Sequence, residues 1–131
     1  MKKPRKPKPI EKPAGDFLPL SAPILHILLA LADGEAHGYA IMQGVAQQSE
    51  GIIRLGPGTL YGAIARMLED GLIEESHERP DPAMDDSRRR YYRLTQFGGE
   101  VLAAETKRLS ALLRAARASK AIRNMKPAEE R

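Results

Sequence analysis

The sequence predicts a mainly α-helical fold of the α+β class, with three helices, a two-stranded hairpin and a long C-terminal helix. Three observations support this prediction. Apolar residues at helical spacing follow a Pro-Gly-Thr corner at residues 57–59. Gly71 ends that helix, and the apolar pair at 72–73 that begins a strand follows at once. Mostly leucines then recur at alternating steps of four and three over residues 102–116, which is typical of a helix that packs against another helix.

Length and composition fit one soluble globular domain. The chain has 131 residues, of which 42% are hydrophobic and 29% charged, enough for one modest core. The absence of cysteine excludes disulfides, thiol catalysis and cysteine-bound zinc. The longest apolar run, residues 24–32, is too short to cross a bilayer, and no apolar signal segment follows the basic N-terminus. We therefore expect a cytoplasmic protein with no membrane partner.

The N-terminus is rich in lysine and proline. Residues 1–13 hold six basic residues and one acidic residue, whereas the rest of the chain holds 15 basic and 16 acidic residues. Four prolines in this stretch block both helix and sheet, so we expect residues 1–16 to form a disordered basic arm. The arm has two interpretations, a phosphate-seeking extension or a solubilising tail. The remaining boundaries that we expect are 17–95 for the helical domain with its hairpin, 96–123 for the C-terminal helix and 124–131 for a disordered tail.

The first helix is expected over Leu20–Leu31. Ser21 supplies an N-cap, Pro23 suits the first turn, and Asp33-Gly34 ends the helix. Its apolar residues surround the helix axis, so every side needs to be covered. In so small a chain a second subunit would supply part of that cover, and the residues expected to face it are Leu25, Leu28 and Leu29. His26 fits a core or interface histidine better than a ligand.

The second helix opens at His37-Gly38-Tyr39 and turns Gln43 outward. A long glycine-rich turn over residues 49–58 separates it from the third helix, expected from Pro57 to Asp70. The core side of the third helix follows an i, i+4, i+7, i+8 stripe made of Leu60, Ile64, Met67 and Leu68. The free face is small and nearly uncharged and consists of Thr59, Gly62, Ala63 and Arg66, with Tyr61 at its edge.

Two strands are expected over Leu72–Arg79 and Arg88–Leu94, joined by a loop rich in proline and aspartate. Period-2 alternation turns Tyr92 and Leu94 towards the core. The second strand starts with three consecutive arginines, Arg88, Arg89 and Arg90. This basic hairpin is either a ligand-binding surface or an ordinary solvated patch.

The last helix is expected to start at the cap Thr95 and to run to about Ile122. Its seam is apolar on an otherwise charged helix and consists of Leu102, Thr106, Leu109, Leu113 and Ala116. A monomer of this size leaves little for such a seam to cover, so the sequence predicts dimerisation through this helix. The alternative is that the helix packs back on its own domain.

A short helix with a small, polar N-terminal end, followed by a basic hairpin, is what a winged helix-turn-helix uses to bind DNA. The helix enters the major groove and its first turn meets the base edges, while the hairpin lies over the flanking backbone. An enzyme is not expected. Adjacent carboxylates do not converge on one proton, the histidines lack metal-ligand spacing, and no nucleotide-binding loop is present. We therefore expect no catalytic residues, no metal and no cofactor.

The chain resembles the PadR family of bacterial transcriptional regulators over residues 20–113. The matching strings are His-Gly-Tyr-Ala-Ile at 37–41, Gly-Thr-Leu-Tyr at 58–61, Leu-Glu-Asp-Gly-Leu-Ile at 68–73 and Arg-Tyr-Tyr-Arg-Leu-Thr-Gln-Phe-Gly at 90–98. The resemblance implies a winged helix-turn-helix that binds operator DNA as a homodimer, usually as a repressor, through exchange of C-terminal helix contacts. For many members it also implies control by a small phenolic or lipophilic effector.

The resemblance assigns roles to residues at matching positions. Tyr39 matches a tyrosine at the phosphate backbone, Thr59 and Tyr61 match positions of the recognition helix that face DNA, and Arg88–Arg90 match the basic arm of the wing. The full expected DNA-binding set is Tyr39, Gln43, Pro57, Gly58, Thr59, Tyr61, Arg66, Arg88, Arg89 and Arg90. The alternative function is a winged-helix module that binds another protein, since a fold alone does not fix function. An apolar stripe exposed on the third helix would favour that alternative, whereas small polar residues favour DNA.

Overall fold

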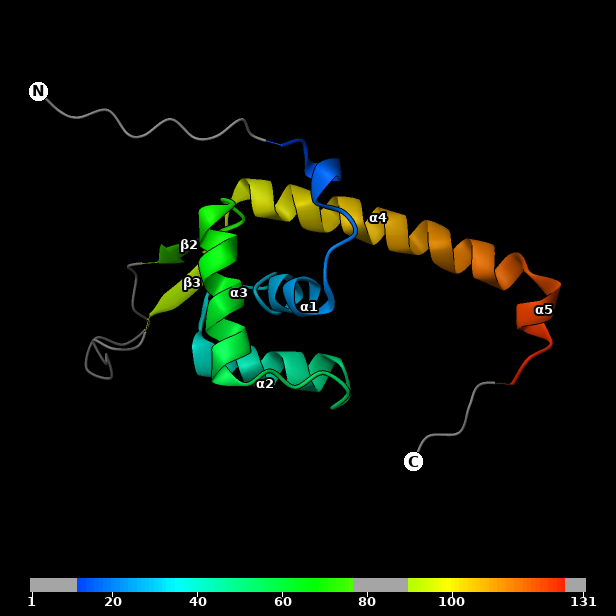
Figure 1. Ribbon diagram of the computed structural model, residues 1–131, viewed down its shortest axis with the longest axis horizontal. Coiled ribbons are helices and arrows are strands. Elements are labelled where there is room, and N and C mark those ends of the chain that lie inside the picture. Colours follow the sequence, from blue (N-terminus) through cyan, green and yellow to red (C-terminus); the bar gives the residue numbers. More distant parts are fainter. Residues whose placement is uncertain (1–11, 77–89, 127–131) are drawn as a thin grey trace, which may run out of the picture.

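The computed structural model describes residues 12–76 and 90–126 of the chain. Within these residues it is mainly helical with a small antiparallel sheet, which confirms the predicted fold class (Figure 1). The elements in chain order are the 3-10 helix η1 (Ala14–Phe17), α1 (Ala22–Ala30), β1 (Ala36–His37), α2 (Gly38–Gln48), α3 (Pro57–Glu69), β2 (Ile73–Ser76), β3 (Tyr91–Leu94), α4 (Gln96–Ala118) and α5 (Lys120–Arg123).

The helix starts lie where local chemistry places them. The Ser21 hydroxyl accepts from the Ile24 amide at 3.4 Å and begins α1. The His37 Nδ1 accepts from the Ala40 amide at 3.3 Å and begins α2. The predicted starts are therefore confirmed, because a side-chain acceptor satisfies an amide that the first helical turn leaves unpaired.

The sheet has one strand more than the sequence predicts. Its order is β1-β3-β2, with β3 antiparallel to both neighbours. Ile73 lies opposite Leu94 and Ser76 opposite Tyr91, while Ala36 pairs with Tyr92 on the other side of β3. A two-residue strand such as β1 is too short to display a period of two, so the pattern could not reveal it.

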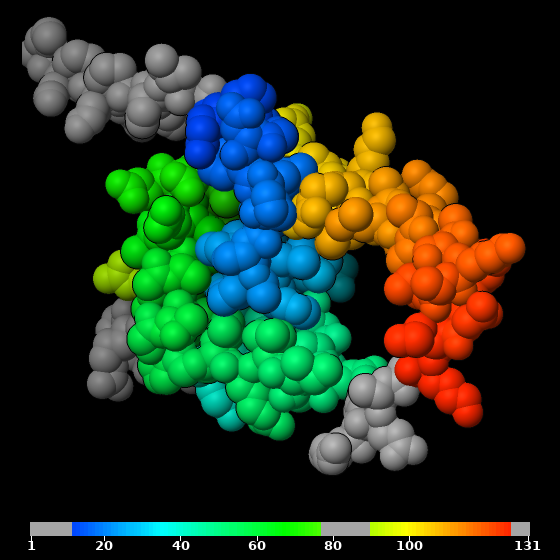
Figure 2. Space-filling view, turned by 45° about the vertical axis from the view of Figure 1, so that its right-hand side comes forward, coloured from blue at the N-terminus to red at the C-terminus, as the bar shows by residue number. Residues whose placement is uncertain are grey.

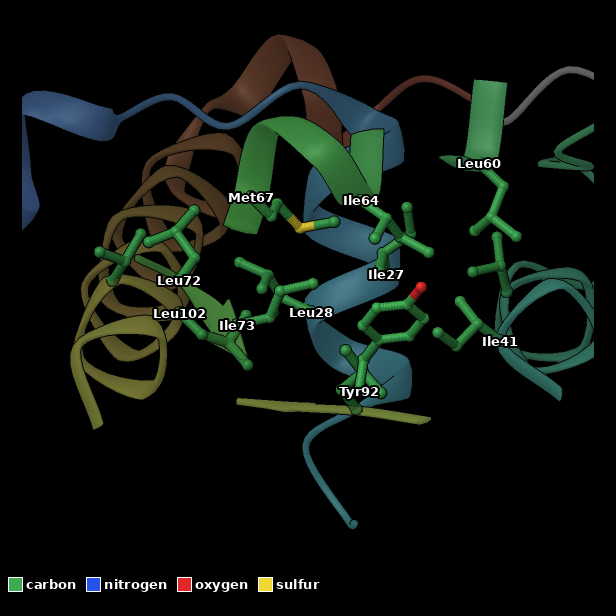
Figure 3. Close-up of a cluster of buried hydrophobic side chains, with 13 residues drawn as sticks. Ile27, Leu28, Ile41, Leu60, Ile64, Met67, Leu72, Ile73, Tyr92 and Leu102 are labelled. Carbon is green, nitrogen blue, oxygen red and sulfur yellow. The ribbon is translucent and has the colours of Figure 1, made fainter. Parts of the chain in front are cut away.

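The core lies where α1, α2, α3 and the start of α4 converge on β3 (Figure 3). Its buried members are Ile27, Leu28, Leu31, Ile41, Val45, Leu60, Ile64, Met67, Leu72, Ile73, Tyr92, Val101 and Leu102. Burial, and then the nearby Glu75 carboxylate, raise the pKa of the Tyr92 hydroxyl, which stays protonated. The predicted core side of α3 is correct for three residues and wrong for Leu68, whose side chain is 38% exposed. The buried face of α3 is therefore narrower than the face that its apolar residues occupy.

α4 is joined to the sheet through a backbone contact at Gly98. A Cβ atom on Gly98 would overlap the Leu72 carbonyl group, so only glycine fits between the helix and the chain that enters β2. The predicted cap Thr95 holds the same joint. Its hydroxyl accepts from the Gly98 amide at 2.9 Å and donates to the Gly71 carbonyl at 2.6 Å, while its own amide donates to the Leu72 carbonyl at 3.1 Å.

The segment before α1 packs on α4 rather than standing free. We call residues 12–20 the strap; they contain η1 and cross the first half of α4 (Figure 1). The rings of Phe17 and Phe97 meet edge to face at 5.6 Å, and the Leu20 amide donates to the Glu105 carboxylate at 3.0 Å. The expected boundary of the disordered arm at residue 16 is therefore corrected, because η1 starts at Ala14.

Glu105 is fully buried, which the sequence pattern does not reveal. Two bonds from the Arg108 guanidinium, at 2.6 and 2.9 Å, reach its two carboxylate oxygens. These bonds outweigh burial, and with the Leu20 amide they hold the pKa of Glu105 below its ordinary value. The pair ties the strap to α4.

The C-terminal helix ends earlier than expected. α4 stops at Ala118, and the Ser119 hydroxyl accepts from the Ile122 amide at 3.3 Å to begin α5. Ser119 has extended backbone geometry, so the chain changes direction there. The single helix predicted to Ile122 is thus two helices.

Candidate nucleic-acid interface

Tyr39 and Gln43 extend from the outer face of α2. The Tyr39 side chain is 62% exposed, and its hydroxyl accepts from the Gln43 amide group at 3.4 Å. Both residues were expected at the interface, and the structure brings them together one helical turn apart. A phenol and an amide on an open helix surface are groups that bind phosphate oxygens in protein–DNA complexes.

The start of α3 is open. Gly56 is the N-cap, no side chain caps the helix, and its first turn holds no acidic residue. Pro57, Gly58 and Thr59 are all exposed, as is Gly62 one turn further along the helix. Such a helix end favours negative charge, because unpaired amides and the helix dipole both point outward.

The Tyr61 side chain is partly exposed to solvent and partly packed against α2. Its side chain is 49% exposed, yet its hydroxyl lies so close to Gly38 that a Cβ atom at Gly38 would overlap it. The contact brings the exposed start of α2 and the exposed face of α3 together. Gly38 of the His-Gly-Tyr string is therefore a packing residue, a role that its sequence context alone does not indicate.

Arg66 lies on the same side of α3, where it lines a groove with the strap and the start of α1. The groove has a volume of about 530 Å³, and Lys12, Thr59, Ala63 and Asp70 also line it. The exposed face of α3 is therefore small and polar for most of its length. Leu68 is the one large aliphatic side chain on α3 that is more than a third exposed.

The hairpin is described only near its base. Arg88 and Arg89 lie outside the described residues, as does the acidic part of the loop. Arg90 is exposed and lies 3.4 Å from the Glu75 carboxylate, a long contact that leaves its guanidinium accessible. Arg93, which was not among the expected DNA-binding residues, forms a closer ion pair of 2.9 Å with Glu74 on the next strand.

The expected dimer surface needs a correction. Leu28 has no exposed surface and Leu102 is 8% exposed, because both belong to the core of one chain, so they offer almost nothing to a partner. Leu25 packs partly against that core. Thr106 stays exposed, and its hydroxyl donates to the Leu102 carbonyl of its own helix at 2.9 Å. The apolar pattern could not separate residues that cover their own core from residues that would cover another chain.

The rest of the expected surface is open. Leu29, Leu109 and Leu113 are 39%, 37% and 50% exposed, and Ala116 is partly covered. Further exposed apolar residues that the predicted seam omitted are Leu112, Ile122 and Met125. Figure 2 shows the end of α4 and α5, in orange and red, standing away from α1 and α2 across an open hollow. This apolar face has no cover within the described part of the chain.

Two features of residues 12–76 and 90–126 bear on other functions. No helix there is long and apolar enough to cross a membrane. Within the same ranges, no group of three histidine or carboxylate side chains gathers as a metal site would require.

Comparison with known proteins identifies relatives of this chain. The family described as "Transcriptional regulator PadR-like family" matches residues 25–104. The transcriptional regulator Rv3488 of Mycobacterium tuberculosis is 37% identical over 90 residues, which cover 69% of this chain and 78% of that protein. An uncharacterized 37.1 kDa protein in transposon TN4556 of Streptomyces fradiae is 41% identical over 86 residues, covering 66% of this chain but only 22% of that protein.

The fold also matches a solved structure. A PadR family transcription regulator from Clostridium difficile superimposes with a TM-score of 0.60 over 74% of this chain and 96% of that chain. Its sequence identity of 22% makes this a likeness of fold.

Proposed function

Because the chain belongs to the PadR-like family of transcriptional regulators, we propose that it binds operator DNA as a homodimer and acts as a repressor. In this proposal α3 enters the major groove, Tyr39 and Gln43 contact the backbone, and Arg88–Arg90 of the hairpin grip the flanking phosphates. We also propose that a small lipophilic or phenolic ligand relieves the repression. Both repression and its relief are inferred only from membership of the family.

The observation that carries the DNA-binding part is the exposed face at the start of α3. Thr59 and Gly62 leave room for a close approach, Tyr61 offers a hydroxyl at the edge, and the uncapped helix end favours phosphate. The Tyr39–Gln43 pair stands beside this face on α2. The arrangement matches the division of labour in DNA readers, in which backbone contacts position the protein and base contacts specify the sequence.

The first test is a selection of bound fragments from genomic DNA, followed by binding measurements on the enriched duplex. We expect Thr59→Ala and Tyr61→Phe to weaken binding to the enriched duplex at least about fivefold, the lower end of the effect of one base contact, with little change on random DNA. Phenylalanine keeps the ring that packs near Gly38, so the fold is retained. Lys107→Ala, on the exposed side of α4, is the matched control.

Equal losses of affinity on enriched and random duplexes would contradict this assignment, because they would mean that α3 contacts only the DNA backbone. If no sequence is enriched from genomic DNA, the specific-binding proposal itself is wrong.

The dimer proposal rests on the open apolar face of α4. We expect Leu109→Ala and Leu113→Ala to weaken self-association by about 2 kcal/mol each, or roughly 30-fold in the dissociation constant, the low end for a leucine truncation because part of each side chain is already covered. Sedimentation velocity across a concentration series measures this. Lys107→Ala serves again as the control, because two residues turn the helix by about 200° and place Lys107 opposite Leu109. An intact chain that sediments as a monomer at micromolar concentration would overturn the proposal.

A further inference from the structure

Arg54 is the only lysine or arginine among residues 13–65, a range that spans α1, α2 and the turn into α3 and that holds four acidic residues. Its side chain is exposed, and it forms no ion pair with any residue of the described ranges 12–76 and 90–126. Proteins gain most of their attraction to DNA from lysine and arginine side chains that neutralise phosphates. An unpaired guanidinium in the turn of a helix-turn-helix is therefore a candidate DNA contact.

The turn between α2 and α3 holds the backbone of Arg54 in place. The Ser49 hydroxyl accepts from the Ile53 amide at 2.9 Å and donates to the Ile53 carbonyl at 3.2 Å, which closes the first part of the turn. Ile53 and Leu55 are partly buried and pack against the core, whereas Arg54 between them is exposed. The chain is thus anchored on both sides of a side chain that faces solvent.

The guanidinium of Arg54 lies over the turn and next to α2. A Cβ atom at Gly51 would lie 3.3 Å from a terminal nitrogen of Arg54. Arg54 lines an open hollow of about 590 Å³, whose other lining residues are Gln43, Ala46, Gln47, Glu50 and Gly51. Figure 1 shows the chain that leaves the end of α2 running back along this helix to the start of α3. The turn therefore brings Arg54 to the outer side of α2.

Three polar side chains form a row on that outer side. Tyr39, Gln43 and Gln47 follow one another at steps of four residues, which places them on one face of α2, and all three are exposed. The row is about 12 Å long, because eight residues separate its ends. Tyr39 and Gln43 are already joined by a hydrogen bond of 3.4 Å. Arg54 adds a positive charge at the Gln47 end of this row.

We propose that Arg54 and Gln47 bind a phosphate of the DNA backbone, further along the strand than the phosphate that Tyr39 and Gln43 contact. This proposal rests on the proposed function. A guanidinium can donate two parallel hydrogen bonds to one phosphate, and the Gln47 amide supplies another donor. Such a contact reads no base edge, so it adds affinity for any sequence. Glu50 lines the same hollow, and its carboxylate repels the phosphate.

A salt titration tests the charge of the contact. Arg54→Gln is expected to reduce the slope of log K against log salt by about 0.9 for each bound chain, on enriched and random duplexes alike. Arg54→Lys keeps the charge and should keep the slope, although it loses the paired hydrogen bonds and part of the affinity. Glu50→Gln should strengthen binding by about twofold at low salt, the effect of one like charge at roughly 8 Å in water.

Arg114→Gln is the matched control, because it removes the same charge from an exposed position of α4. We expect it to leave the slope unchanged. If Arg54→Gln leaves the slope unchanged, or if Arg114→Gln lowers it equally, the proposal is wrong. Circular dichroism of each variant checks that the fold is retained.

Neutral phosphates test the position of the contact. Methylphosphonate, which carries no charge, replaces the phosphates that flank the half-site of the enriched duplex one at a time. At the phosphate that Arg54 contacts, the replacement should weaken the intact chain and leave the affinity of Arg54→Gln nearly unchanged. Gln43→Ala should lose its sensitivity at a different phosphate. If Arg54→Gln stays fully sensitive at every phosphate, Arg54 provides only long-range attraction and the contact is wrong.

Failure of the proposed function would appear elsewhere, in the selection from genomic DNA, where no duplex would be enriched. The slope measured on random DNA would still decide for or against Arg54.

Discussion

Replacing Gly98 by alanine is expected to destabilise the fold by about 3 kcal/mol or more. The added methyl group would overlap the Leu72 carbonyl, a backbone group that cannot rotate away as a side chain could. Relief requires α4 to separate from β2, which stretches the three hydrogen bonds of Thr95 at the same joint. Overpacking in a tight site costs about 1–3 kcal/mol and occasionally more, and a backbone partner places this site at the upper end.

The neighbouring glycine provides a matched control. Nothing lies within 4 Å of a Cβ atom at Gly99, and alanine is favoured over glycine inside a helix by about 0.8–1 kcal/mol. Gly99→Ala is therefore expected to stabilise the protein where Gly98→Ala destabilises it. Urea denaturation followed by circular dichroism gives both values. Shifts of the same sign in the two variants would refute the close contact at Gly98.

The second large effect concerns the buried Glu105. Glu105→Ala removes the acceptor for Leu20 and Arg108 and leaves a hole under the strap, so we expect a loss of about 3 kcal/mol, the low end for breaking a buried ion pair because Arg108 is partly exposed. Glu105→Gln keeps an oxygen for the Leu20 amide and should lose less. The same denaturation series compares the two variants. Equal losses would contradict this expectation, because they would mean that the charge of the carboxylate accounts for the whole effect.

Glu105 also gives stability a pH dependence. The pKa of its carboxyl group is lowered in the folded chain, so the folded state favours the ionised form. Its contribution is complete above the ordinary pKa of 4.5 and is lost as the pH falls through the lowered folded value. In Glu105→Gln the unfolding free energy should therefore fall less steeply between neutral and acidic pH than in the unaltered protein.

Local chemistry made much of the fold predictable. Ser21, His37 and Thr95 carry acceptors that suit a helix start, and the 57–71 segment has a corner, an apolar stripe and a terminal glycine within one helix length. These signals depend on neighbours along the chain. They led to the correct positions of α1, α2 and α3 and to the pairing of β2 with β3, and they placed Thr59 and Arg66 on an exposed face of α3.

Features that depend on distant parts of the chain could not be predicted. A charged residue on a helix is usually exposed, so nothing in the sequence marked Glu105 as buried under the strap. Glycine is required at position 98 because of the Leu72 carbonyl, which lies 26 positions away along the chain. Leu28 and Leu102 fit an interface and a core equally well by pattern, because a period describes which face is apolar and not what covers it.

The joint at Gly98 has a mechanical consequence. α4 spans 23 residues, or about 35 Å, and its first turn is wedged against the chain that leaves α3 through Gly71. A tilt of about 5° at this fulcrum would displace the far end of α4 by about 3 Å. A partner chain seated near Leu113 would thus be displaced relative to α3, the helix that we propose faces DNA, by any tilt at this joint. The close contact at Gly98 would then fix the distance between the two α3 helices of a dimer.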